Sequence, residues 1–447
     1  MKIGLISLGC SKNLCDSEVM LGLMEKQQLE ITNNPAEAEI IIVNTCGFIE
    51  AAKEESINTI LQMAAYKKDL CRYLIVTGCL AQRYARQLLE EMPEIDAVVG
   101  TNAYEDIVRV IERLLKGERV LQLEKTAGPV TLPANLRKLT TPSYMAYLKI
   151  AEGCDNFCSF CAIPFIRGRY VSKPYEEVLA EAKYLVSRGV KELILIAQDT
   201  TRYGEDLYKQ VRLAQLLKDL NDLEGLKWIR VMYCYPNNFN EALIEAFATL
   251  PKVCKYVDLP LQHASDRLLN AMHRYDKKAD VKQLLHKLRQ RIPGIAIRTT
   301  FIVGFPGETE ADFAELKEFV QEERFENAGV FTYSQEENTV AAKLPGQIPD
   351  EVKQNRYHEL MSLQASISEE IRQQQEGREF EVLVEGYNPD TPNLAVGRSY
   401  REAPEIDGDV FIENAPGLLT GQFVQVRVAQ GFTYETVTEL VQEPVKD

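Results

Sequence analysis

The chain has 447 residues, 45% of them hydrophobic, which is enough for about three domains with sizeable buried cores. Its 51 basic and 66 acidic residues give a net charge of −15, which argues against a protein that binds mainly by neutralising nucleic-acid phosphates. No apolar run of about 18 residues occurs and the first residues lack the features of a signal peptide, so we expect a soluble, cytoplasmic protein without a membrane partner. In that compartment the ten cysteines are expected to be metal ligands or packing residues rather than disulfides.

Residues 1–125 alternate short β-branched runs with helical stretches, which predicts an open parallel-sheet α/β domain. Three predicted strands end on a cysteine: Cys10 closes ISLGC, Cys46 closes IIVNTC and Cys79 closes LIVTGC. Because the carboxyl ends of parallel strands share one edge of a sheet, the three thiols can meet there. The alternative is three buried packing cysteines. Four further cysteines lack this regularity, and we interpret them as packing residues: Cys15, Cys71, Cys234 and Cys254.

Residues 126–143 contain three prolines and few large apolar residues, so we interpret them as a linker. Residues 144–375 form a second series of about six strand–helix repeats that ends in a long polar helix, which predicts a partial, TIM-like barrel of the (β/α)6 type. Its active edge would lie at the carboxyl ends of the strands. Residues 376–447 alternate short strands with Gly, Pro and Asp turns, which predicts a small antiparallel β-barrel. The predicted fold class is therefore α/β with a C-terminal barrel.

The sequence GCDNFCSFCAIP, residues 153–164, places Cys154, Cys158 and Cys161 on the loop after the first barrel strand. Nothing within about thirty residues downstream could serve as a fourth ligand, whereas structural zinc sites and saturated iron–sulfur sites take four protein ligands. An incomplete set leaves a coordination position for a small molecule, which indicates a catalytic metal centre. A zinc site that borrows a distant histidine is disfavoured because the chain has only four histidines. An electron-transfer ferredoxin is disfavoured by the missing fourth cysteine.

The spacing C-x3-C-x2-C after a parallel strand, with Phe160 directly before the third cysteine, resembles the radical S-adenosylmethionine (SAM) superfamily. The resemblance implies that Cys154, Cys158 and Cys161 hold a 4Fe–4S cluster whose fourth iron binds the methionine moiety of SAM. It also implies that Phe160 lies against the adenine. These three cysteines are therefore the predicted catalytic residues, because the cofactor carries the radical chemistry.

Further SAM contacts are implied at the ends of other barrel strands. Gln198 and Asp199 follow the second strand, where the superfamily contacts the SAM amino group, although the usual Gly-Gly-Glu is absent. Gly304, in RTTFIVGFPGET, resembles the glycine of the ribose-side segment, where a missing side chain allows close backbone approach. Arg167 and Arg169, in IRGRY, could pair with the SAM carboxylate or with surface carboxylates.

The chain resembles the methylthiotransferase family over essentially its whole length. Members of that family have, in this order, a cysteine set in an N-terminal α/β domain, a radical SAM barrel and a small barrel of the TRAM type. The resemblance implies a second 4Fe–4S cluster on Cys10, Cys46 and Cys79, which handles the transferred sulfur. It implies that one SAM donates a methyl group and another generates the radical. An electron-donor protein is implied as a partner.

Within this family, SLGCSKNLCDSE, AEGCDNFCSFCAIPFIRG and IAQDTTRYG resemble the members that modify a ribosomal protein, with Cys15 where valine is usual. The implied substrate is an aspartate of small-subunit ribosomal protein twelve, modified at its β-carbon, either free or on the ribosome. Residues 377–447 support this, since five basic and 13 acidic residues give a net −8 that would repel phosphates and attract a cationic protein. An acidic surface that only maintains solubility is the alternative explanation.

Nucleic acid is accordingly not the expected primary substrate. Two other functions stay open on the sequence. The first is a tRNA adenosine methylthiotransferase of the same family. The second, from a different class, is a non-enzymatic electron carrier with two clusters.

Overall fold

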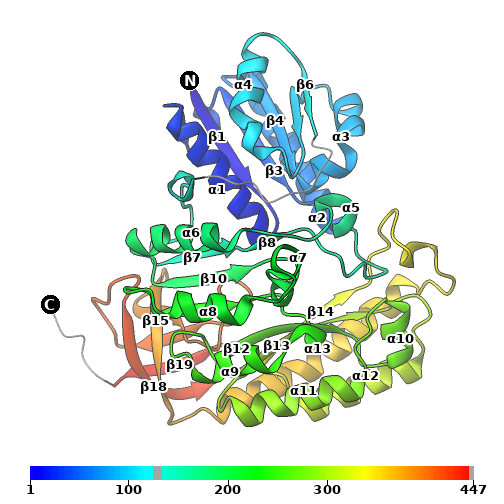
Figure 1. Ribbon diagram of the computed structural model, residues 1–447, viewed down its shortest axis with the longest axis vertical. Helices are drawn as coiled ribbons and strands as arrows, with labels where there is room; N and C mark the ends of the chain where they lie inside the picture. Colours follow the sequence, from blue (N-terminus) through cyan, green and yellow to red (C-terminus); the bar gives the residue numbers. More distant parts are fainter. Residues whose placement is uncertain (124–132, 442–447) are drawn as a thin grey trace. The chain divides into compact units, whose positions relative to one another are not determined.

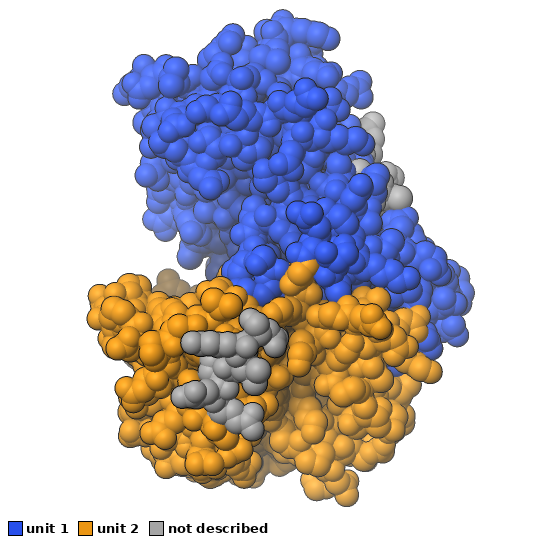
Figure 2. Space-filling model, turned by 90° about the vertical axis from the view of Figure 1, so that its left-hand side faces the viewer, with its two compact units in different colours: residues 1–188, 193–216, 334–342 blue, residues 189–192, 217–333, 343–447 orange. Residues whose placement is uncertain are grey.

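The computed structural model describes residues 1–123 and 133–441. The chain divides into two compact units, coloured separately in Figure 2. Unit 1 comprises residues 1–188, 193–216 and 334–342, and unit 2 comprises the rest of the chain. None of the helices within the described ranges is both long and apolar enough to span a membrane.

The first 123 residues fold around a parallel sheet with helices on both faces (Figure 1). The strands in spatial order are β2 (Glu30–Thr32), β1 (Lys2–Ser7), β3 (Ile40–Thr45), β4 (Tyr73–Gly78), β5 (Ala97–Val99) and β6 (Val120–Gln122). The helices are α1 (Ser11–Lys26), α2 (Glu50–Ala64), α3 (Cys79–Glu91) and α4 (Ile107–Leu115), with short 3₁₀ turns η1 (Pro35–Glu37), η2 (Ala65–Lys68) and η3 (Tyr104–Asp106). The sheet confirms the α/β fold predicted from the alternating pattern.

Alternating side chains of this sheet enter two separate hydrophobic cores. Ile40 and Ile42 face the core shared with α1 and α4, whereas Ile41 and Val43 face the core shared with α2 and α3. All of β3 is buried, as expected for a central parallel strand that is covered on both sides. This packing explains why the strand has no polar face in the sequence.

The remainder of unit 1 holds the second cysteine loop. Its elements are η4 (Ala134–Leu136), β7 (Met145–Lys149), β8 (Ala151–Glu152), α5 (Ile163–Arg167), β9 (Val171–Ser172), α6 (Tyr175–Ser187), β10 (Glu192–Ile196), η5 (Thr200–Arg202), α7 (Glu205–Tyr208) and α8 (Leu213–Asn221), the ends of β10 and α8 lying in unit 2. Strands β7 and β10 are neighbours in one sheet. Strands β8 and β9 pair antiparallel and so close the base of the loop that carries the cysteines.

The segment predicted as a linker lies partly outside the described residues. From Pro133 onward it packs against α1, where a Cβ on Gly22 would lie 1.5 Å from the carbonyl oxygen of Leu136. The amide of Lys138 also donates to the carbonyl of Glu18 at 3.0 Å. This end of the segment is therefore attached to the N-terminal sheet domain.

Unit 2 continues the strand–helix alternation predicted for the barrel. Its strands are β11 (Trp228–Val231), β12 (Tyr256–Gln262), β13 (Ala296–Val303) and β14 (Asn327–Thr332), of which the last three pair in parallel. Its helices are η6 (Pro236–Asn238), α9 (Glu241–Thr249), α10 (Asp266–Ala271), α11 (Lys278–Arg291), α12 (Glu310–Glu323), η7 (Ala341–Lys343, mostly in unit 1) and α13 (Asp350–Gln373). The helix α13 is the long polar helix that the sequence predicts.

The C-terminal residues form a small closed barrel (Figure 1). Around the barrel the strands are β15 (Glu379–Asn388), β16 (Thr391–Arg398), β17 (Val410–Glu413), β19 (Thr436–Leu440) and β18 (Phe423–Gly431). All neighbours pair antiparallel except β17 and β19, which pair in parallel. Strand directions cannot alternate all the way around a closed ring of five, so one parallel pair is required.

Candidate functional site

The three N-terminal cysteines lie at the carboxyl ends of β1, β3 and β4, which are adjacent strands. A Cβ built on Gly9 would lie 2.8 Å from the Cβ and 3.2 Å from the Sγ of Cys46, so the backbone beside Cys10 touches Cys46. A Cβ built on Gly47 would lie 2.9 Å from the carbonyl carbon of Cys79. The structure thus brings Cys10, Cys46 and Cys79 together, as the strand pattern predicts.

Asn13, on the first turn of α1, holds these strand ends in place. Its Nδ2 donates to the carbonyls of Leu8 and Thr45, each at 3.0 Å, and so joins the ends of β1 and β3. Its Oδ1 lies 3.6 Å from the Sγ of Cys79. Sequence reasoning gave Asn13 no role, although it lies three residues after Cys10 in the segment SLGCSKN.

Arg167, on α5, is the charged group that contacts this triad. Its side chain is only 1% exposed, and it donates to the carboxylates of Asp16 at 3.2 Å and Glu152 at 2.9 Å and to the Oδ1 of Asn13. The interpretation from sequence weighed the SAM carboxylate against surface carboxylates as partners. The partners of Arg167 are instead buried carboxylates, because α1 packs where α5 ends.

The charges around the triad act differently on its thiols. Burial raises the pKa of Cys79 to about 12, although Arg167 pulls it down. At Cys10 burial again raises the pKa, but Lys12, Arg167 and the amides at the start of α1 outweigh it, so the net pKa is lowered. The positive charges therefore favour the thiolate form of Cys10, and they would also attract an anionic cluster to this triad.

The second triad lies on the loop between β8 and β9. The amide of Cys154 donates to the carbonyl of Gly168 at 3.2 Å, and the amide of Cys161 donates to the carbonyl of Cys158 at 3.0 Å. Burial and the neighbouring Cys158 and Asp199 raise the pKa of Cys154, the amide of Asn156 lowers it, and together they bring it to about 12. Deprotonation of such thiols is favoured when a metal is present, because metal binding displaces the protons.

Asp199 and Gln198 face the cysteine loop from the end of β10, and Phe160 lies half-buried within that loop. The buried carboxylate of Asp199 accepts a hydrogen bond from the Nδ2 of Asn156 at 3.0 Å, which ties this strand end to the loop. Gln198 donates from Nε2 to Glu152 at 3.0 Å, while its buried Oε1 has no hydrogen-bond partner among the described residues. An orphaned buried acceptor fits a ligand that brings an N–H donor.

Arg169 and Gly304 lie in different surroundings from Gln198. Arg169 is 71% exposed, forms an ion pair with Asp155 at 2.8 Å and lies over the ring of Phe157. Gly304 follows β13 in unit 2 with φ of +73°, and its amide donates to Glu308. A Cβ there would lie 2.3 Å from the Cγ of Lys353, so only glycine fits this turn.

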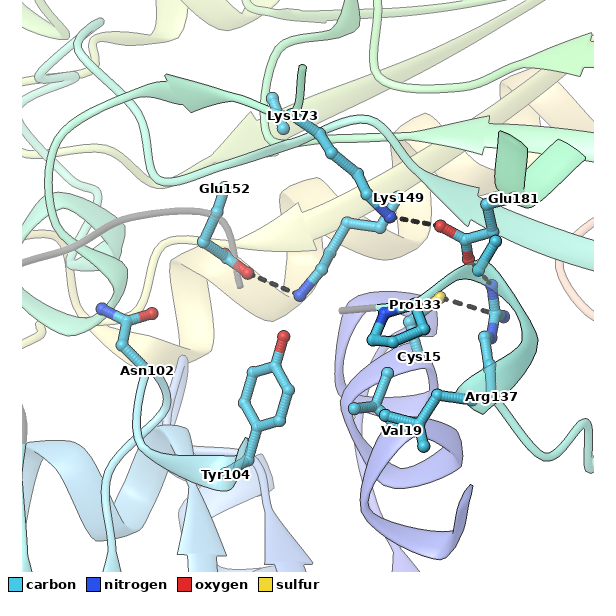
Figure 3. A pocket seen from close by; sticks show the side chains of 13 residues that line it. Cys15, Val19, Asn102, Tyr104, Pro133, Arg137, Lys149, Glu152, Lys173 and Glu181 are labelled. Carbon is cyan, nitrogen blue, oxygen red and sulfur yellow. Dashed lines mark hydrogen bonds and ion pairs between the residues drawn. The ribbon is translucent and has the colours of Figure 1, made fainter. Parts of the chain in front are cut away.

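A cavity of about 60 Å³ lies in unit 1 beside the buried carboxylates (Figure 3). Lys149 pairs with Glu152 at 2.7 Å, Arg137 pairs with Glu181 at 2.9 Å, and Lys173 also pairs with Glu181. Each of these charges has an opposite partner, and the volume suits a few waters. We therefore interpret the cavity as the hydrated part of an ion-pair network that sequence reasoning missed.

The donor sets fit iron–sulfur clusters better than single ions. Within the described part of the chain, no group of three His, Cys, Asp or Glu side chains is arranged around one metal ion. A cubane instead distributes its thiolates over separate irons, so its ligands need not converge on a point. Two sets of three soft thiolates, each next to positive charge or an orphaned acceptor, match such groups in donor chemistry.

Three parts of the chain match known families. Residues 2–100 match the uncharacterized protein family UPF0004, residues 148–320 match the radical SAM superfamily, and residues 377–441 match the TRAM domain. A solved structure of the radical SAM methyltransferase TsrM from Kitasatospora setae shares the fold, with a TM-score of 0.56 and 15% identity, over 74% of each chain. The fold and the cysteine loop define a radical SAM enzyme.

Relatives that match nearly the whole chain show which family of radical SAM enzymes it belongs to. The ribosomal protein uS12 methylthiotransferase RimO of Desulforamulus reducens is 53% identical over 98% of this chain and 99% of the relative. The RimO protein of Heliobacterium modesticaldum is 49% identical over 99% of this chain and 96% of the relative. The chain belongs to the RimO methylthiotransferase family.

Proposed function

We propose that this chain is a radical SAM methylthiotransferase that attaches a methylthio group to the β-carbon of an aspartate in ribosomal protein uS12. One observation carries the proposal: a single compact unit contains two separate triads of free cysteines, one at the ends of adjacent parallel strands and one on a single loop. About half of the residues are identical to RimO proteins over the whole chain, which supports this substrate. The reaction would take place in the cytoplasm, where ribosomal proteins are made and assembled.

In this proposal two 4Fe–4S clusters are bound by the two triads. Cys154, Cys158 and Cys161 hold the cluster that binds SAM, and a second set of cysteines, Cys10, Cys46 and Cys79, holds the other cluster. When bound, these groups supply one-electron cleavage of SAM and delivery of sulfur and methyl. An electron-donor protein supplies the reducing electrons.

The side chains of this chain bind and orient the cofactor. The unpartnered Oε1 of Gln198 would accept a hydrogen bond from the SAM ammonium group, and Asp199 fixes the cysteine loop through Asn156. Phe160 would lie against the adenine, and Gly304, in unit 2, stays a predicted contact for the ribose side of SAM. Arg169 would exchange its exposed ion pair with Asp155 for the SAM carboxylate.

The C-terminal barrel is the proposed docking surface for uS12. The domains in this proposal are residues 1–125, the linker 126–143, the barrel 144–375 and the TRAM barrel 376–447, and the matched family ranges support them. The net charge of −8 on residues 377–447 favours a cationic ribosomal protein over an anionic tRNA. Association should therefore weaken as salt rises, because exposed charges are screened.

The test is an anaerobic comparison of substrates. The protein is reconstituted with iron and sulfide, reduced, and incubated with SAM and either uS12, assembled small subunits or tRNA. A mass gain of one methylthio group on uS12, free or assembled, supports the proposal, whereas modification of tRNA alone rejects it. A non-enzymatic electron carrier would release no 5′-deoxyadenosine in any arm.

A further inference from the structure

Residues 334–342 follow β14 and belong to unit 1 rather than to the unit that precedes them in sequence. We call this segment the strap. It has short-range hydrogen bonds of its own, because both the amide and the Oγ1 of Thr339 donate to the carbonyl of Glu336, at 3.3 and 2.7 Å. The strap therefore has a defined shape over the residues between its two attachment points.

One attachment point is Glu336, which binds charged side chains on the two helices that follow Cys46 and begin at Cys79. Its side chain is 3% exposed and pairs with Arg83 at 2.9 Å and with Lys53 at 3.2 Å. The same Nη1 of Arg83 donates to the carbonyl of Gly47 at 2.7 Å, directly after Cys46. Arg83 itself lies one turn into α3, the helix that begins at Cys79.

The other attachment point is the radical SAM loop. The amide of Ala341 donates to the carbonyl of Ser159 at 2.8 Å. Ser159 is buried and lies between Cys158 and Cys161. The strap is thus hydrogen-bonded directly to the loop of the second triad and, through Arg83, to the loop that follows Cys46, within one compact unit.

The electrostatics make Glu336 the residue on which the first attachment depends. Burial alone would raise the pKa of Glu336, but the hydrogen bonds of Arg83 and Ser334 and the charge of Lys53 lower it, so the carboxylate is charged at neutral pH. A buried carboxylate between two cations is costly to neutralise, since Arg83 then loses its charged partner and Lys53 keeps only Glu50. Loss of the charge would leave Arg83 attached to the strap only through the carbonyl of Glu337, at 3.4 Å, and would loosen its position against the carbonyl of Gly47.

We propose that the strap holds the two cysteine loops at a fixed separation and that Glu336 is its positioning residue. Transfer of a group between two centres requires that they keep a constant relative geometry. Arg167 and the packing of Ala162 and Ile166 on Cys79 already join the two regions on one side, and the strap adds a hydrogen-bonded link on residues from another part of the chain. The inference rests on the proposed function for its purpose, whereas the coupling of the two loops can be measured on its own.

The test compares Glu336→Gln with Glu337→Gln in the full-length, cluster-loaded protein under anaerobic conditions. Both variants lose one negative charge, but Glu337 is exposed and lacks the contacts to Arg83 and Lys53 through its carboxylate. Amide hydrogen exchange is followed in peptides that cover residues 45–49 and 158–161. A third variant, Arg83→Gln, removes the same attachment from the other side.

For Glu336→Gln we expect exchange to accelerate about tenfold in both peptides, as for the loss of a charged buried hydrogen bond. Glu337→Gln should exchange like the native protein, and Arg83→Gln should reproduce the change at residues 45–49. Faster exchange confined to residues 334–342, or no change, would overturn the proposal. Unchanged exchange at residues 40–44 of the buried strand β3, which lies in the same unit as the substitutions, shows that the variants are folded.

A second readout separates this inference from the proposed function. If the native protein methylthiolates uS12, Glu336→Gln should still cleave SAM but form more 5′-deoxyadenosine per modified uS12, by about tenfold. An unchanged ratio would contradict a positioning role. If the native protein modifies no uS12, the proposed function fails, while the exchange result still decides whether the two loops are coupled.

Discussion

Replacement of Arg167 by glutamine tests the ion-pair network that joins α1 to the cysteine loop. Arg167 and Lys149 together face the carboxylates of Asp16 and Glu152, so the buried set contains two positive and two negative charges. Without the guanidinium the set has one uncompensated negative charge. Removal of one partner from a buried pair costs roughly 3–5 kcal/mol, and because Lys149 still contacts both carboxylates we expect about 3 kcal/mol.

The matched control is Arg169→Gln, two residues away. Arg169 is mostly exposed and pairs with Asp155 on the surface, so its loss should cost less than about 1 kcal/mol. Urea unfolding of the apoprotein is followed by far-ultraviolet circular dichroism. The single tryptophan, Trp228, lies in unit 2, and its fluorescence provides an internal control that should not shift.

The difference between native protein and Arg167→Gln should also depend on pH. Burial would raise the pKa of Glu152, but Arg167 and Lys149 hold it well below its usual range. The stabilisation is therefore complete above the ordinary value of 4.5 and is lost as pH falls through the lowered pKa. Equal stability of Arg167→Gln and Arg169→Gln at pH 7, or a difference that grows in acid, would refute this reasoning.

Three further outcomes are expected. Cys46→Ala should lose about half of the bound iron yet still release 5′-deoxyadenosine, because each triad binds its own cluster. Iron analysis and chromatography measure the two quantities, and loss of all the iron together with 5′-deoxyadenosine release would contradict separate sites. Gly9→Ala should lose similar iron because its Cβ would lie 2.8 Å from that of Cys46, whereas Gly117→Ala, at the same φ of +83° but with nothing within 4 Å, should retain it. Glu192→Gln should destabilise unit 2 by roughly 3–5 kcal/mol, detected by tryptophan fluorescence, because the buried Arg230 and Arg398 lose the carboxylate that they share. Burial raises the pKa of Glu192 but its two arginine partners lower it overall, so this effect should fade below about pH 4.5, and an effect that persists there would be contrary to expectation.

The positions of the cysteines could be predicted because their signal is local. Each of Cys10, Cys46 and Cys79 follows an apolar strand, and parallel pairing then places the three strand ends on one edge. The loop of the second triad is likewise continuous in sequence. The α/β fold and the terminal barrel could be predicted for the same reason, since strand and helix periodicity is visible within short windows.

The charged residues of the site could not be predicted in this way. Sequence patterns place arginine and glutamate on the surface, because charged side chains are rarely buried unless they are paired. Arg167 and Asp16 are 151 positions apart, and Arg83 and Glu336 are 253 apart. Neither separation leaves a periodic trace. Only the tertiary structure shows that these pairs are buried and that both contact a cysteine loop.

Variants of the cysteines and variants of the buried charged pairs should behave differently. A cysteine variant removes a ligand and with it a cluster, so it cannot separate cluster binding from the arrangement of the two centres. The long-range pairs of Arg167 and Glu336 leave all six thiols in place. Arg167 also contacts the N-terminal triad and lowers the pKa of its thiols, so Glu336 is the position at which iron content can stay native while the geometry between the two loops changes.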